Sequence, residues 1–139
     1  MGLGGILIWA AATALLEDLH VYSNRDTGIG TNAGYAIVKN CTVELHESGL
    51  SMISGLATNV VVRNSTFVGI YLSQGRLLGS TVTNNAIGLA AGPYTSYTRS
   101  VFMNNGRDFQ DFGTGPSLNA GENICSGGVI CPGFLGIVH

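Results

Sequence analysis

The sequence predicts an all-β fold: a parallel β-helix of about six short coils, stacked as a solenoid with an irregular C-terminal cap. Three observations predict it. A short motif recurs about every 20 residues, glycine supplies 21 of the 139 residues, and asparagine-rich turns separate the copies. Stacking such units about 4.8 Å apart buries apolar rows that no single unit could bury alone. The length suits one domain, so we expect residues 1–139 to form a single β-helix domain.

The first strand of each coil is predicted from a four-residue motif: a small residue, an aliphatic residue, any residue, and an apolar or small residue. We place its copies at residues 5–8, 28–31, 49–52, 69–72, 86–89 and, in degenerate form, 106–109. Because alternate residues of a strand face the same side, the motif predicts one inward ladder of aliphatic side chains. This ladder comprises Ile6, Ile29, Leu50, Ile70 and Ile87.

A second motif falls between the copies of the first and predicts the remaining strands. Its copies are residues 16–21, 38–43, 62–67, 78–82 and 97–102. One ladder of smaller inward residues would hold Leu19, Cys41, Ser65 and Ser80, and another would hold Val21, Val43, Phe67, Val82 and Phe102. Asparagine and glycine suit the corners because both tolerate left-handed backbone angles.

The C-terminal segment differs from the rest of the chain. We expect the coils to span about residues 5–112 and the cap about residues 113–139, where the repeat ends. Cys125 and Cys131 bracket a glycine-containing loop that permits the tight turn of a disulfide, whereas zinc binding would need further Cys or His ligands. A disulfide would predict an extracellular or periplasmic location. The uncharged residues 2–16 lack the basic segment of a secretory signal, so the localisation stays open.

The N-terminal coil has no predicted cap, because the repeat begins at Gly5. Two explanations stay open. The coil could pair with another chain in a homo-oligomer, burying Ile6, Ile8 and Trp9, or the sequence could be the C-terminal piece of a longer β-helix protein.

Charge and hydropathy exclude two classes of partner. The net charge of −2 leaves no basic surplus to neutralise phosphates, so we expect no nucleic acid partner. The apolar N-terminal run ends at Glu17, which makes it too short for a membrane-spanning helix, and we expect no membrane partner.

The repeated units, notably residues 49–67 and 84–89, resemble the right-handed parallel β-helix repeats of the pectate-lyase-like superfamily. The resemblance covers residues 5 to about 112 and implies a right-handed, single-stranded helix. It also implies binding or processing of an acidic polysaccharide, by lyase, hydrolase or epimerase chemistry if the protein is an enzyme. Members of the superfamily carry clustered Asp with Arg or Lys, and sometimes Ca²⁺, on one outward sheet. Ca²⁺ rests on this resemblance alone, and no other cofactor is evident.

The outward positions of the predicted first strand depart from that pattern. They are Leu7, Gly30, Ser51, Tyr71, Gly88 and Asp108, which include a single carboxylate. An enzyme would need paired groups for acid–base work. The alternative is therefore a non-catalytic structural or interaction module.

The best local candidate for chemistry lies at two corners that stacking would bring together. Asp26 lies in one corner and His46 and Glu47 lie in the next, so His46 could act as a general base beside two acids. Solvated turn residues are the other interpretation, because polar corners are expected on any solenoid. Substrate contacts are predicted for Arg25 at the first corner and for the aromatic residues Tyr71 and Trp9. No metal ligand set is predicted, and Glu17 with Lys39 is predicted to form a surface ion pair.

Overall fold

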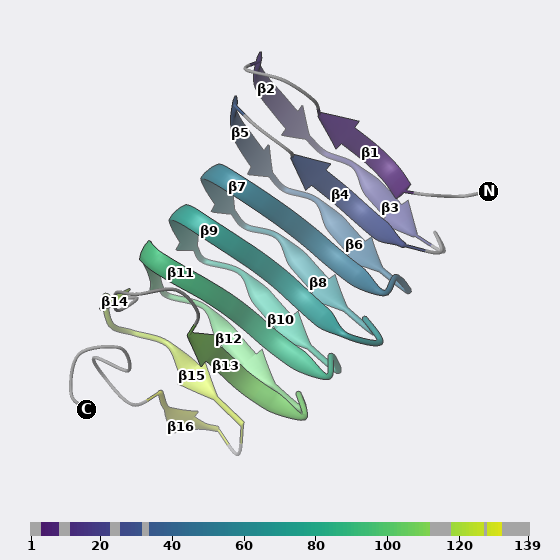
Figure 1. The fold of residues 1–139 in the computed structure, drawn as a ribbon. Helices are drawn as coiled ribbons and strands as arrows, with labels where there is room; N and C mark the ends of the chain where they lie inside the picture. The colour runs from purple at the N-terminus through teal and green to yellow at the C-terminus, as the bar shows by residue number, and fades with distance from the viewer. Residues whose placement is uncertain are drawn as a thin grey trace.

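The computed structural model describes residues 4–8, 12–22, 26–31, 34–111, 118–126 and 128–131. In these residues the chain forms a right-handed parallel β-helix of about five turns, with strands and no helix. Figure 1 shows the coils stacked side by side, from β1 at the N-terminal end to the short β14–β16 segments at the other. The predicted fold class is confirmed. None of the described residues forms a helix long and apolar enough to cross a membrane.

Each coil turns through three faces. The first face contains β1 (Gly4–Ile8), β4 (Thr27–Thr31), the first halves of β7 (Ser48–Thr58), β9 (Val68–Leu78) and β11 (Ile87–Thr98), and finally β13 (Arg107–Asp111). The second face contains β2 (Ala12–Glu17), β5 (Gly34–Lys39), the second halves of β7, β9 and β11, and β14 (Leu118–Asn119). The third face contains β3 (His20–Tyr22), β6 (Thr42–Glu44), β8 (Val61–Arg63), β10 (Thr81–Thr83), β12 (Val101–Met103), β15 (Ile124–Cys125) and the antiparallel β16 (Val129–Ile130).

The inward ladder of the first face follows the predicted motif with one correction. Its members are Ile6, Ile29, Leu50, Ile70, Leu89 and Phe109. The prediction of Ile87 was wrong by two residues, because Ile87 pairs with Val68 and Leu89 pairs with Ile70. The motif at residues 86–89 has the right residue types, but Gly88 rather than Ala86 stands before the buried aliphatic residue.

The third face carries a similar correction. Val62 pairs with Val43 and Val82, so it takes the place predicted for Phe67. Phe67 lies at a corner and is 54% exposed. Val60, not Ser65, is the residue that precedes β8 beside Cys41 and Ser80. Cys41 itself is buried, as predicted for a small core residue.

Asparagine occupies many of the corners, as predicted. Between the second and third faces, Asn40 and Asn59 have positive φ of 55° and 53°. Between the third and first faces, Asn64, Asn84 and Asn104 have φ of 60°, 58° and 57°. Left-handed backbone angles at the same place in successive coils let the chain turn the same corner each time.

A polar ladder runs inside the corner between the third and first faces. Ser65 N donates to Asn85 Oδ1 at 2.9 Å, and Asn85 N donates to Asn105 Oδ1 at 2.9 Å. Asn105 Nδ2 then donates to Asp108 Oδ1 at 3.0 Å, and Asp108 Oδ2 accepts from Ser126 N at 3.0 Å. The ladder therefore satisfies backbone groups at buried corners and ties the last coil to the cap.

The described part of the cap is held by a second polar contact and a disulfide. Ser100 N donates to Asn123 Oδ1 at 2.9 Å. Cys125 and Cys131 form the disulfide that their spacing permits. Such bonds persist in oxidising compartments, so an extracellular or periplasmic location is the prediction that follows for this chain.

The first coil is less buried than those after it. Ile6, Ile8, Leu16 and Leu19 are partly buried and pack against the core, whereas Ile29, Leu50 and Ile70 are fully buried. Association of two chains through this coil stays a prediction, and Trp9 lies outside the described residues.

Candidate functional site

The outward column of the first face is the surface where the sequence predicts a substrate. Strand register places in it Leu7, Gly30, Ser51, Tyr71, Ala90 and Gln110. Ala90 and Gln110 replace the predicted Gly88 and Asp108, because the register of β11 and β13 is shifted by two residues from the predicted one. Asp108 instead bonds to Asn105 and Ser126. The column thus carries no carboxylate.

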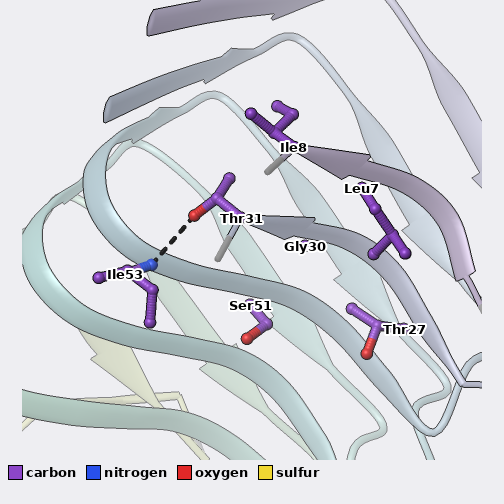
Figure 2. Close-up of a pocket in the computed structure, with 7 residues that line it drawn as sticks. All are labelled: Leu7, Ile8, Thr27, Gly30, Thr31, Ser51 and Ile53. Atoms are coloured by element: carbon purple, nitrogen blue, oxygen red, sulfur yellow. Dashed lines mark hydrogen bonds between the residues drawn. The ribbon is translucent and has the colours of Figure 1, made fainter. Parts of the chain in front are cut away.

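A hollow of about 240 Å³ opens on this face, and its lining residue Ser51 pairs with Tyr71 of the next strand. It exists because Gly30 and Ser51 present little side chain between Leu7 and Tyr71 in the column. Its lining combines apolar and hydroxyl side chains: Leu7, Ile8, Thr27, Gly30, Thr31, Ser51 and Ile53. Figure 2 shows these residues, with Thr31 Oγ1 accepting a hydrogen bond from the backbone N of Ile53 at 3.1 Å. That bond holds the bend at the edge of the hollow.

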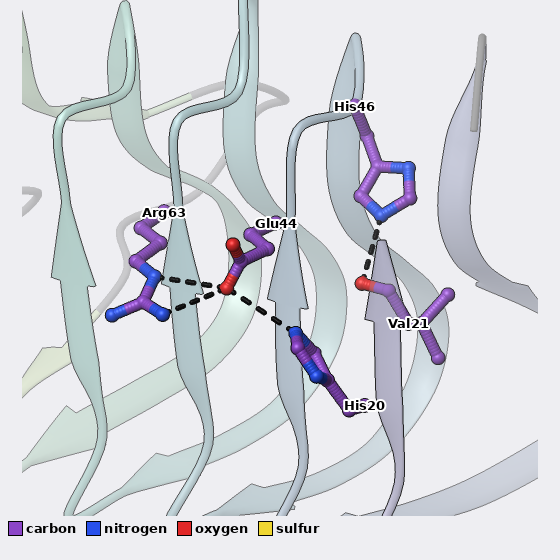
Figure 3. Close-up of polar contacts among 5 residues, drawn as sticks. All are labelled: His20, Val21, Glu44, His46 and Arg63. Atoms are coloured by element: carbon purple, nitrogen blue, oxygen red, sulfur yellow. Dashed lines mark hydrogen bonds and ion pairs between the residues drawn. The ribbon is translucent and has the colours of Figure 1, made fainter. Parts of the chain in front are cut away.

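The predicted corner site is brought together only in part. The backbone N of Glu47 donates to the carbonyl O of Asp26 at 3.0 Å, so the two corners do stack, and both side chains are exposed. His46 points inward, is 2% exposed, and places Nε2 at 3.0 Å from the carbonyl O of Val21 (Figure 3). This places the imidazole of His46 inside the coil, in the same corner as the polar ladder, whereas the two carboxylates lie outside.

The third face carries a polar cluster of His20, Glu44 and Arg63. Glu44 Oε2 accepts from Arg63 Nη2 at 2.8 Å and Nε at 3.1 Å, and lies 3.3 Å from His20 Nε2. Figure 3 shows the three side chains converging from β3, β6 and β8. The hydrogen bonds from Arg63 lower the pKa of the Glu44 carboxyl below its ordinary value; desolvation opposes this, and the His20 contact adds to it.

The sequence did not predict this cluster, although it predicted the Glu17–Lys39 ion pair, which is present at 3.4 Å. The predicted alignment of residues 62–67 with residues 38–43 was wrong, and it placed Arg63 beside Lys39. In the structure, Lys39 pairs with Thr58 of the next coil, and Glu44 pairs with Arg63. The signal that could have found it is the repeat of Asn40 at Asn59, which places Val61–Arg63 on the third face.

Glu44→Gln is expected to flatten the acid dependence of stability. A carboxyl whose pKa is lowered by folding stabilises the fold at pH values above its unfolded pKa. That contribution is lost as the pH falls through the folded pKa, and the glutamine variant would have no such contribution to lose. Urea unfolding midpoints between pH 7 and pH 3 measure the effect. The control is Glu122→Gln, because Glu122 and its partner Arg99 are both 74% exposed and such pairs contribute little. Equal slopes for Glu44→Gln and wild type would contradict the role of Glu44.

Two predicted substrate residues, Trp9 and Arg25, lie outside the described residues. Tyr71 is described and lies outward and half-buried in the first-face column. The described residues contain no group of three or more His, Cys, Asp or Glu side chains that could hold a metal ion. Binding of Ca²⁺ stays a prediction that rests on the family resemblance alone.

Comparison with known proteins gives a family match. A family model described as a right handed beta helix region matches residues 1–106. No curated protein and no solved structure matches the chain. The family match covers the coils as far as the start of β13 and leaves the cap outside.

Proposed function

Because the chain belongs to the right-handed β-helix family, we propose that its first face binds an acidic polysaccharide and does not cleave it. The observation that carries this proposal is the hollow at Gly30 and Ser51, bordered in the same column by Tyr71. An aromatic ring can pack on the apolar side of a sugar, and hydroxyl groups such as those of Ser51 and Thr27 can pair with its polar edge.

The shape of the face suits a chain that runs along the solenoid axis. Such a chain crosses one strand about every 4.8 Å. It would pass from the hollow over Tyr71, the next outward residue of the column. The outward residues of the column carry no carboxylate, so an acidic polysaccharide would meet no like charge there.

The same lack of carboxylates supports binding without cleavage. Glycoside hydrolysis ordinarily uses two carboxyl groups flanking the scissile bond. The first-face column has none, and the nearby Asp108 is hydrogen-bonded to Asn105 and Ser126. At the corner, the imidazole of His46 lies inside the coil, away from the exposed side chains of Asp26 and Glu47.

Tyr71→Ala is expected to weaken polysaccharide binding by about tenfold, because a lost ring contact is worth about 1 kcal/mol or more. Ser51→Phe, which fills the hollow, should weaken it similarly. Affinity electrophoresis in gels containing polygalacturonate, alginate or a glycosaminoglycan measures this, with Ca²⁺ and with a chelator. The control is Tyr22→Ala, which removes an exposed tyrosine from the third face.

Two results would count against the proposal. Wild-type affinity in both Tyr71→Ala and Ser51→Phe would place binding elsewhere. New reducing or unsaturated chain ends that appear with wild type would show an enzyme instead.

An interaction module is the second candidate, favoured by an apolar stripe on the second face. Leu15, Ile37 and Leu56 lie in one outward column there, and Leu15 is 60% exposed. No binding across the whole polysaccharide panel would favour this function.

A further inference from the structure

We propose a second sugar-binding site, on the C-terminal half of the second face, that selects a carboxylate-bearing sugar residue. Four side chains build it: Gln74 and Arg76 from β9, and Tyr94 and Ser96 from β11. The proposal rests on the proposed function for the nature of the ligand, a polysaccharide. It goes further by assigning the recognition of negative charge to a different face.

Strand register places the four side chains in a compact square. Tyr94 pairs with Gln74, and Ser96 pairs with Arg76, in parallel strands. Neighbouring strands lie about 4.8 Å apart, and every second residue of a strand is about 6.6 Å further on. All four residues occupy outward positions, because the residues between them, Gly75 and Thr95, occupy inward ones. The square is therefore about the size of one sugar ring.

A β-bulge presents the aromatic member of the square. The register of β11 against β9 shifts between Ala91 and Tyr94, where β11 has one extra residue. Gly92 lies in this bulge, and a side chain there would overlap the carbonyl of Ser73. Directly after it, Thr95 is buried and its Oγ1 donates to the carbonyl O of Leu72 at 2.9 Å. The bulge is thus anchored from inside, and Tyr94 is left 76% exposed.

Arg76 supplies the charge selectivity. It is exposed, and none of the ion pairs among the described residues includes it. Its neighbours in the column, Leu56 and Ser96, are uncharged. The one carboxylate placed outward on this face by the described strands, Glu17, lies three coils away and pairs with Lys39. An unpaired guanidinium between uncharged neighbours fits a carboxylate, which it can bind through two parallel hydrogen bonds.

A hollow lies further along β9, where its lining residue Leu78 is two residues beyond Arg76. This hollow, of about 340 Å³, lies where the second face turns into the third, and its lining is Thr58, Asn59, Leu78, Gly79 and Arg99. Gly79 opens it, because no atom lies within 4 Å of the place where its side chain would begin. The sugar ring would pack on Tyr94 with its carboxylate on Arg76, and the neighbouring sugar would extend toward the hollow.

The test compares charged and uncharged forms of one ligand. Oligogalacturonate and oligoalginate would be titrated against the full chain by calorimetry, alongside their methyl esters, which have no carboxylate charge. Arg76→Gln should weaken binding of the charged oligomers about tenfold and leave the esters unchanged. Tyr94→Ala should weaken both forms, and Tyr94→Phe should restore them. The control is Lys39→Gln on the same face, because Lys39 is already paired with Glu17.

The outcomes separate this site from the first-face site. Equal affinity of Arg76→Gln and wild type for the charged oligomers would overturn the second site, as would an equal loss in Lys39→Gln. Loss in Arg76→Gln with none in Tyr71→Ala would support the second site and contradict the first. No binding of any charged oligomer to wild type would overturn both.

Discussion

Gly75→Ala is expected to destabilise the protein by about 3 kcal/mol or more. Gly75 lies in β9 with φ of +133°, a backbone angle that strains any L side chain. A Cβ atom there would overlap the backbone oxygen of Gly55 in the neighbouring coil. Since both atoms belong to strands packed coil on coil, neither can move without breaking the ladder.

Urea unfolding followed by far-UV circular dichroism measures this loss. The matched control is Gly79→Ala, which makes the same substitution at another glycine with positive φ, 54°. No atom lies within 4 Å of the added methyl at Gly79, so only the backbone cost of about 1–2 kcal/mol is expected. Equal midpoints for the two variants would show that the close approach of Gly55 and Gly75 does not matter to stability.

Asn85→Ala is expected to cost about 2–4 kcal/mol, because it interrupts the internal polar ladder at its centre. The Asn85 side chain is buried, accepts from Ser65 N at 2.9 Å, and donates to Asn105 Oδ1 at 3.1 Å. Alanine would leave the Ser65 amide without that acceptor in a buried corner. A buried hydrogen-bond donor without an acceptor lowers the free energy of unfolding.

Hydrogen exchange gives a second readout for Asn85→Ala besides the unfolding midpoint. The amide of Ser65 should lose protection, while that of Thr81 on β10, which donates to Val60 O at 2.9 Å, should keep it. The control is Asn59→Gly, which preserves the left-handed corner and removes an exposed hydrogen bond to Asn40. We expect that variant to lie within about 0.5 kcal/mol of wild type. A similar cost in both variants would contradict the importance of the buried ladder.

Several features of the candidate sites could be predicted without coordinates. The outward position of Tyr71 and the Cys125–Cys131 disulfide follow from local alternation or spacing, and the Glu17–Lys39 pair follows because the copies at residues 16–21 and 38–43 were aligned in the correct register. The Glu44–Arg63 pair and the Gln74–Tyr94 square could not be predicted in this way. They depend on which residues of different coils stand side by side, and coil lengths vary.

The sequence by itself determined that this protein is a β-helix. A repeated small–aliphatic pattern with asparagine corners predicts stacked coils, because only stacking buries every aliphatic row at once. Register was decided by the tertiary structure. The distance between successive ladder residues is 23, 21, 20, 19 and 20 along Ile6, Ile29, Leu50, Ile70, Leu89 and Phe109. A slip of two residues at Leu89, or of five at Arg63, leaves the motif recognisable and changes which side chains meet. That is why His46 lies inside the coil and Arg63 meets Glu44: backbone hydrogen bonds and core packing select one register, and composition does not.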